Sequence, residues 1–249
     1  MKKIIFLFVF VILLFPVISK ADSFTISSNA LLDWGSFTIT GVDVVWGQKY
    51  TKAKTANVPH VIVNGWSVPI SNDSQIDNFT ISSIATDSIM SSKVGFSYSK
   101  DQYNSDNDIC TSITRFGRFQ VEESGPVSFA INYKLESSRA IDPLFQPAFM
   151  SSGTSSWVHL SINSPGANTQ TYLMLPGIAG IANDSQSKEG TLTVHGDFIK
   201  GVDYEFRIDI SNGVNGYVSV PEPASILLLG FGLIGLAGIR RKFKKWKNA

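Results

Sequence analysis

Between residues 22 and 219 the sequence alternates apolar and polar residues with a period of two, and this pattern limits the fold more than any other feature. Side chains of a strand point alternately to the two faces of a sheet, so this period is typical of strands with one buried face. No stretch in this interval carries apolar residues at helical spacing over three turns. We therefore expect an all-β body. The alternating segments are residues 23–27, 36–40, 78–82, 94–98, 127–133, 157–162, 192–195 and 204–210.

Turn signals separate these segments and indicate how they are arranged. Many short strands with frequent turns and no crossover helices favour an antiparallel β-sandwich. We expect the jelly-roll form, which extracellular lectin-like domains often use. One domain with a long loop between Ser137 and Ser156 is favoured over two domains. The turn signals are Asn64-Gly65, Ser124-Gly125-Pro126, Ser152-Gly153, Ser164-Pro165-Gly166, Glu189-Gly190 and Asn212-Gly213.

The N-terminal residues have the organisation of a secretory signal peptide. Lys2 and Lys3 precede an apolar stretch over residues 4–17, and Ser19-Lys20-Ala21 supplies the small residues of a cleavage site. We expect signal peptidase to remove residues 1–21. An uncleaved N-terminal anchor is the alternative.

The C-terminal residues consist of a proline motif, an apolar run and a basic tail. Pro221-Glu222-Pro223 cannot be helical, because proline fixes φ and lacks an amide donor. The run over 224–239 would form a helix roughly 24 Å long, slightly short of the ~30 Å hydrocarbon core. We predict a transmembrane helix there, with the tail as a stop signal on the cytoplasmic side and the body exported. The stop signal consists of Arg240, Arg241, Lys242, Lys244 and Lys245.

Residues 220 to about 245 resemble the PEP-CTERM sorting signal of exported proteins in Gram-negative bacteria that also make extracellular polysaccharide. Pro221-Glu222-Pro223, the glycine-rich apolar run and Arg240-Arg241-Lys242 carry the resemblance. It implies processing by an exosortase, a membrane-embedded cysteine transpeptidase-like enzyme. It also implies an inner-membrane-anchored precursor that becomes a cell-surface or extracellular protein. A plain single-pass anchor is the alternative.

The charge of the exported body excludes one class of partner. Residues 22–219 carry 12 Lys and Arg and 19 Asp and Glu, a net charge of −7, whereas the whole chain is +1. Nucleic-acid binding needs clustered cations to displace counterions from phosphates, so we expect no nucleic-acid partner. Cys110 is the only cysteine, which prevents a disulfide within the chain. We expect its thiol to be buried and unreactive beside Asp106 and Asp108.

Catalytic motifs are not evident in the body. His60, His159 and His195 stand far apart, and Gly-x-Ser-x-Gly and phosphate-binding glycine loops are absent. His159 and His195 occupy alternating strand positions where they could meet across a sheet around a metal, although ordinary surface histidines are the favoured interpretation. No motif marks a pair of glutamates for glycoside hydrolysis. We therefore predict a non-enzymatic protein without a required cofactor.

One polar run offers ligands for calcium. Asn104, Asp106 and Asp108 place oxygen atoms at alternating positions, and these can converge on Ca²⁺ when a loop curls. The tight-turn glycine and the downstream glutamate of an EF-hand are missing. A solvated polar turn is therefore the favoured alternative.

Aromatic residues raise the question of glycan binding, because ring faces stack on the C–H surfaces of sugars. Trp34, Trp46, Tyr50, Trp66 and Tyr103 lie near predicted turns, and Trp157 begins a strand. Core packing is favoured for most of them. Two functions remain: an exported surface or matrix protein acting by adhesion or exopolysaccharide association, and a secreted glycan-active hydrolase. The missing catalytic motif favours the first.

Overall fold

The computed structural model describes residues 23–56, 58–76, 79–99, 107–142, 149–164, 167–175, 177–178 and 183–219. Within these residues the chain is built of β-strands, and no helix there is long and apolar enough to cross a membrane. The predicted signal peptide, the predicted span over 224–239 and the basic tail lie outside them. The strands are β1 (Ser23–Gly41), β2 (Val44–Thr55), β3 (Val58–Asn64), β4 (Ile70–Ser71), β5 (Ser74–Ile76), β6 (Phe79–Ala85), β7 (Ile89–Ser99), β8 (Asn107–Val121), β9 (Gly125–Ile141), β10 (Phe149–Ser164), β11 (Ala167–Leu175), β12 (Asp184–Phe198) and β13 (Tyr204–Ser219).

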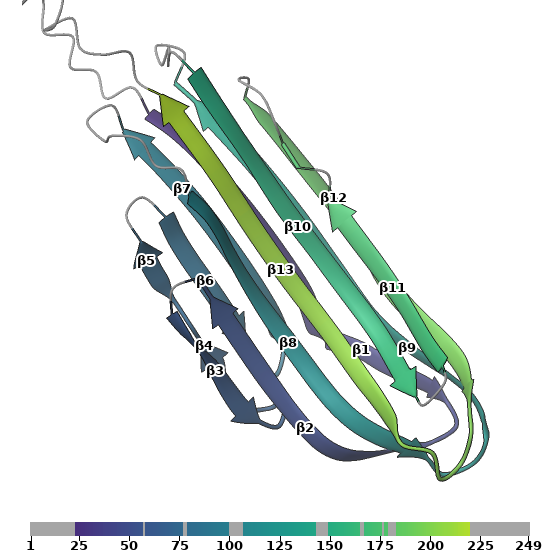
Figure 1. The fold of residues 1–249 in the computed structure, drawn as a ribbon. Coiled ribbons are helices and arrows are strands. Elements are labelled where there is room, and N and C mark those ends of the chain that lie inside the picture. The colour runs from purple at the N-terminus through teal and green to yellow at the C-terminus, as the bar shows by residue number, and fades with distance from the viewer. Residues whose placement is uncertain are drawn as a thin grey trace, which may run out of the picture.

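The strands form two antiparallel sheets that pack face to face, which confirms the predicted β-sandwich (Figure 1). The seven-stranded sheet has the order β12-β9-β1-β7-β6-β4, with β5 also paired to β6. The six-stranded sheet has the order β11-β10-β13-β8-β2-β3. The chain changes sheet repeatedly between β7 and β13, so both layers contain strands from both halves of the sequence.

Each predicted alternating segment lies in a strand over its described residues; only Asn78, the first residue of one segment, is outside them. In β9, for example, Val127, Phe129, Ile131, Tyr133 and Leu135 are buried while the residues between them are more exposed. β1 joins two predicted segments, 23–27 and 36–40, into one strand whose pairing with β9 is irregular between Asp33 and Thr38. Alternating burial is thus the physical basis of the fold.

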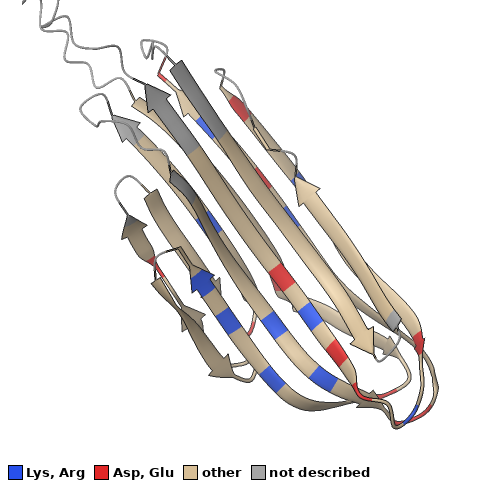
Figure 2. Cartoon of the chain, viewed as in Figure 1, with Lys and Arg blue, Asp and Glu red and all other residues tan. Residues whose placement is uncertain are grey.

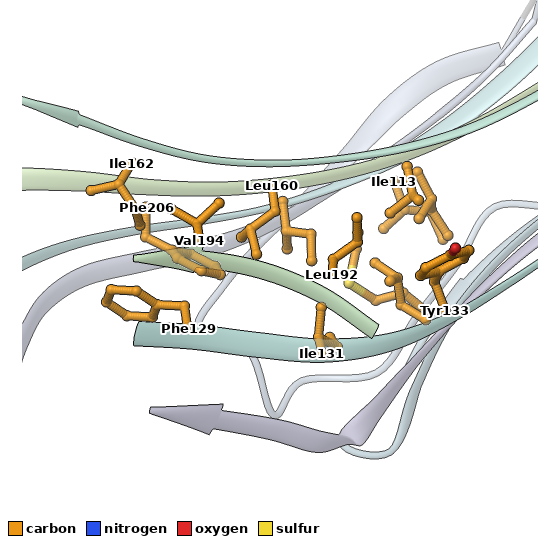
Figure 3. Close-up of a cluster of buried hydrophobic side chains, with 14 of the residues drawn as sticks. Ile113, Phe129, Ile131, Tyr133, Leu160, Ile162, Leu192, Val194 and Phe206 are labelled. Atoms are coloured by element: carbon orange, nitrogen blue, oxygen red, sulfur yellow. The ribbon is translucent and has the colours of Figure 1, made fainter. Parts of the chain in front are cut away.

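The largest apolar cluster fills the sandwich where β9, β10, β12 and β13 face one another (Figure 3). Phe119, Phe129 and Phe206 form its aromatic centre, with ring centroids 5.3 and 5.6 Å from Phe129 to Phe119 and Phe206. Tilted aromatic pairs at such distances add about 0.5–1.5 kcal/mol each beyond the area they bury. A smaller cluster around Phe24, Phe79 and Phe96 lies separately.

A belt of buried polar side chains separates the two apolar clusters. Asn212 joins the sheets: its Oδ1 accepts hydrogen bonds from Ser28 Oγ (2.9 Å) and Ser156 Oγ (2.7 Å), and its Nδ2 donates to the carbonyl of Ser92. In the six-stranded sheet, Ser156, Asn212, Thr111 and Thr55 are direct neighbours on β10, β13, β8 and β2. Buried polar groups are costly unless paired, so this network favours one register of the two sheets.

Three predicted turns and the predicted loop over Ser137–Ser156 are wrong. Gly153, Gly190 and Gly213 lie inside β10, β12 and β13. A Cβ at Gly213 would lie 2.7 Å from Ser155 Oγ, and one at Gly153 would lie 2.5 Å from Asn215 Oδ1. These two glycines therefore make room for neighbouring side chains in the sheet. β9 continues to Ile141 and β10 begins at Phe149, so most of the predicted loop is strand.

The first and last strands leave the sandwich at the same end. The carbonyl of Ser23 accepts a hydrogen bond from the amide of Asp142, and Ser219 pairs with Phe149 just across the β9–β10 connection. Figure 1 shows the start of β1 and the tip of β13 together at this end. β1 lies between β7 and β9, and β13 lies between β8 and β10.

Candidate functional site

The outward side chains of the six-stranded sheet form the best-organised polar surface in the described part of the chain. Because neighbouring strands pair in register, these side chains line up in rows across β2, β8, β13, β10 and β11. We call this surface the outer face. Its rows are Lys52-Thr114-Asp209-His159-Tyr172, Tyr50-Phe116-Arg207-Ser161-Gln170 and Lys54-Ser112-Ser211-Trp157-Met174.

Asp209 is the centre of the outer face. It points outward from β13, yet its side chain is only 4% exposed because its neighbours cover it. Thr114 Oγ1 donates to Oδ1 (2.5 Å), and Arg207 Nε donates to Oδ2 (2.6 Å). His159 Nδ1 lies 3.5 Å from Oδ2, an ion-pair distance at the limit of hydrogen bonding. One carboxylate therefore fixes side chains from three strands.

The pKa values around Asp209 follow from these contacts. Burial raises the pKa of Asp209, but the interactions with His159, Arg207 and Thr114 outweigh burial and lower it below its usual value. The Asp209 carboxylate in turn raises the pKa of His159, with a smaller contribution from Gln170, against the opposing effect of burial. It also raises the pKa of Arg207. Asp209 is thus held ionised beside Arg207 and His159.

Aromatic and apolar side chains occupy the β10–β11 side of the outer face. The rings of Trp157 and Tyr172 lie 5.8 Å apart, and Tyr172 is 54% exposed. Met174, in the same row as Trp157, is 46% exposed. His159 Nε2 lies 3.2 Å from Gln170 Oε1, and this contact orients both side chains on the β10–β11 side of the outer face. One exposed ring, with the half-buried Trp157 ring beside it, therefore lies next to oriented polar atoms.

Cationic side chains occupy the opposite side of the outer face. Figure 2 shows Lys and Arg gathered on β2, β8 and β13. Arg118 pairs with Glu205 (3.1 Å), and Arg207 pairs with Asp209. Lys52 and Lys54 on β2 make no ion pair with any described residue. Two uncompensated positive charges therefore project from one strand.

The three tryptophans near predicted turns meet, but not as an open platform. Trp66 contacts both Trp34 (5.2 Å, 78°) and Trp46 (4.5 Å, 72°) edge to face, and all three rings pack half-buried against the core. Flat stacking on a sugar needs an exposed ring face, so this cluster fits the core interpretation. Tyr50 instead reaches the outer face, where it stacks on Phe116 (4.8 Å). Tyr103 lies outside the described residues.

A buried arginine accompanies the tryptophans. Arg115 projects inward from β8, and its guanidinium lies 4.1 Å from the Trp34 ring centroid. Its Nη2 donates to the carbonyls of Trp66 (2.8 Å) and Thr86 (2.5 Å). Burial lowers its pKa to about 10, with Asp87 opposing the change. These contacts tie the loop after β3 and the β6–β7 turn to the sandwich.

The other residues singled out in the sequence lie apart from one another or outside the described residues. His159 lies in the six-stranded sheet and His195 in the seven-stranded sheet, so the two do not meet. Cys110 is exposed, which overturns the prediction of a buried thiol, because its side chain points outward from β8. Asn104 and Asp106 lie outside the described residues, and Asp108 is the second residue of β8. Within the described residues, no group of three His, Cys, Asp or Glu side chains could hold a metal ion.

Sequence reasoning did not find Asp209, Arg207 or Thr114. The strand 204–210 was predicted, and Arg207 and Asp209 occupy its polar side. An acid flanked by a cation two residues away on a polar strand face is a weak signal. The partners Thr114 and His159 come from β8 and β10, and only the register of the sheet reveals them.

Fold and site together define an antiparallel β-sandwich with one polar and aromatic sheet face. A family model, the PEP-CTERM protein-sorting motif, matches residues 219–242, so the chain carries this sorting motif directly after β13. The motif implies a protein that is exported and processed by an exosortase, as the sequence predicted. No curated protein and no solved structure matches the chain.

Proposed function

We propose that this chain is a non-enzymatic surface or extracellular-matrix protein that associates with extracellular polysaccharide through the outer face. The observation that carries the proposal is the row containing Asp209, His159 and Tyr172, where oriented polar groups lie beside one exposed aromatic ring. The sorting motif supplies the location. Signal peptidase would release the N-terminus, and the apolar run over 224–239 would hold the precursor in the inner membrane until the exosortase acts.

The strand order supports a jelly-roll scaffold for this function. From β7 to β13 the chain crosses to the other sheet after every strand except β10, which forms a hairpin with β11 in the same sheet. β1 lies between β7 and β9, the place that the last strand of a jelly roll would take. Counted in this way, the orders β7-β1-β9-β12 and β8-β13-β10-β11 are those of two interlocked Greek keys. Such sandwiches present broad sheet faces, which suit extended ligands.

The test uses mature protein purified from a host that carries an exosortase. We expect the host's own exopolysaccharide to retain the protein without any shortening of the polysaccharide chains. Tyr172→Ala should weaken retention, because it removes an exposed ring from the outer face. Asn168→Ala, an exposed change on the same strand outside the three rows, is the control. Absence of retention would contradict the proposal.

A secreted glycan-active hydrolase is the competing function. The pairing of Asp209 with His159 favours it, because a carboxylate that orients a histidine also occurs in hydrolytic triads. His159 Nε2, however, faces Gln170. Shortening of the polysaccharide in the same experiment, lost in His159→Gln, would establish the hydrolase.

A plain single-pass anchored protein is the alternative to exosortase sorting. Deleting Pro221-Glu222-Pro223 should abolish release to the surface and leave the precursor in the membrane. Unchanged release after this deletion would show that the exosortase does not process the chain.

A further inference from the structure

We infer that the polysaccharide bound by the outer face is acidic, and that Lys52 and Lys54 contact its carboxylate groups. This inference rests on the proposed function and adds the chemical class of the ligand. Lys52 and Lys54 lie on the β2 side of the face, whereas Trp157 and Tyr172 lie on the β10–β11 side.

The outer face differs in charge from the rest of the body. The body between residues 22 and 219 has a net charge of −7. The three rows of the outer face and the neighbouring Arg118–Glu205 pair nevertheless contain four cations, Lys52, Lys54, Arg118 and Arg207, and only two acids, Glu205 and Asp209. Arg118 and Arg207 are already neutralised by Glu205 and Asp209. The charge available to a ligand therefore comes from Lys52 and Lys54, on a surface whose sign is opposite to that of the body.

The lysines and the exposed aromatic ring lie far apart on the outer face. Lys52 and Lys54 are two residues apart on β2, so both project from the same face about 7 Å apart. Four strand spacings separate β2 from β11, a span of about 19 Å. A ligand that reaches both Lys52 and Tyr172 must be extended across the sheet, as several linked sugars are. Aromatic stacking on one side and charge pairing on the other then act on a single chain.

Other occupants fit the same face less well. A neutral polysaccharide would leave the two ammonium groups without partners. Nucleic acid would be repelled by the acidic body, because its affinity depends on many phosphate contacts. A second copy of the chain would carry the same positive charges to the interface. An acidic polysaccharide satisfies both sides of the face.

The experiment measures binding of the mature protein to polygalacturonate, as the acidic probe, and to dextran, as the neutral one. We expect tighter binding to polygalacturonate, weakening as salt rises. The double variant Lys52→Gln/Lys54→Gln should bind polygalacturonate about five- to thirtyfold more weakly. Lys93→Gln/Lys188→Gln, which removes the same charge from exposed positions on the seven-stranded sheet, should change binding less than about twofold. Circular dichroism checks that both variants are folded.

Each outcome separates this inference from the proposed function. If the Lys52/Lys54 variant binds polygalacturonate as tightly as the unaltered protein, the inference fails while retention on host exopolysaccharide still supports the function. Equal losses in both double variants would show an effect of net charge alone and would also overturn it. Equally tight binding of a DNA duplex would indicate a general polyanion surface and contradict a polysaccharide site. Binding to neither probe nor host polysaccharide would reject the proposed function itself.

Discussion

Asp209 shows how one carboxylate can organise a surface that is otherwise made of flexible side chains. Arg207 is 53% exposed and His159 22% exposed, and both would sample several rotamers without this shared partner. Asp209 is buried, so water does not compete with these side chains for hydrogen bonds to its carboxylate oxygens. Asp209 therefore holds them in one arrangement. The outer face is therefore ordered before any ligand arrives.

Replacing this carboxylate should destabilise the fold. We expect Asp209→Asn to lower the free energy of unfolding by about 1–3 kcal/mol, because Arg207 and His159 lose their counter-charge while the shape is kept. Urea denaturation measures the change. Asp197→Asn, at an exposed position on β12, should stay within about 0.5 kcal/mol. Equal losses in the two variants would argue against the organising role of Asp209.

The raised pKa of His159 gives a pH dependence with a defined sign. The folded protein binds the His159 proton more tightly than the unfolded chain, whose pKa is near 6.5. The stability contributed by His159 is thus fully present below about pH 6.5 and is lost as pH rises through the folded pKa. We expect the unfolding free energies of the unaltered protein and His159→Gln to differ more at pH 6 than at pH 8.5. A difference that does not change with pH would contradict this.

At the scale of elements, two long strands that the sequence did not predict, β2 and β8, have polar residues facing inward. β2 directs Lys49, Thr51 and Thr55 toward the interior, and β8 directs Thr111, Arg115 and Gly117 there. A search for alternating apolar residues fails on such strands, although their pairing is regular. The stretches with strictly apolar inward positions, such as residues 127–135 of β9 and 204–210 of β13, were predictable. The outer face was not, because its rows depend on register, which no local pattern encodes.

Gly117 in β8 is required by the tryptophan cluster. A Cβ at this position would lie 2.6 Å from the Trp46 ring and 2.7 Å from the Trp66 ring. Gly117→Ala should therefore displace both indoles and destabilise the protein by about 1–3 kcal/mol, with a shift in tryptophan fluorescence. Gly95→Ala in β7, where the nearest atom is 4.0 Å away, is the matched control and should be close to neutral. A similar loss at both glycines would mean that the packing of the indoles is not the cause.

At the scale of the whole molecule, the sandwich depends on strands from the two extremes of the body. β13 supplies Asp209 to the outer face and Asn212 to the polar belt, and it pairs along both edges. A chain that ends at Asp203 should therefore fail to fold, whereas one that ends at Val220 should unfold cooperatively. Circular dichroism during urea denaturation distinguishes them. A cooperative transition in the shorter chain would show that β13 is dispensable.

The central place of β13 also sets an order of events during export. Synthesis and translocation proceed from the N-terminus, so β13 is the last strand to emerge, immediately ahead of the sorting motif. Until it arrives, β8 and β10 lack the neighbour that lies between them. The sandwich can close only after β13 has emerged, with the sorting motif directly behind it. The exosortase would then receive a finished domain whose two ends emerge side by side, and a single cut there would free it without disturbing any strand.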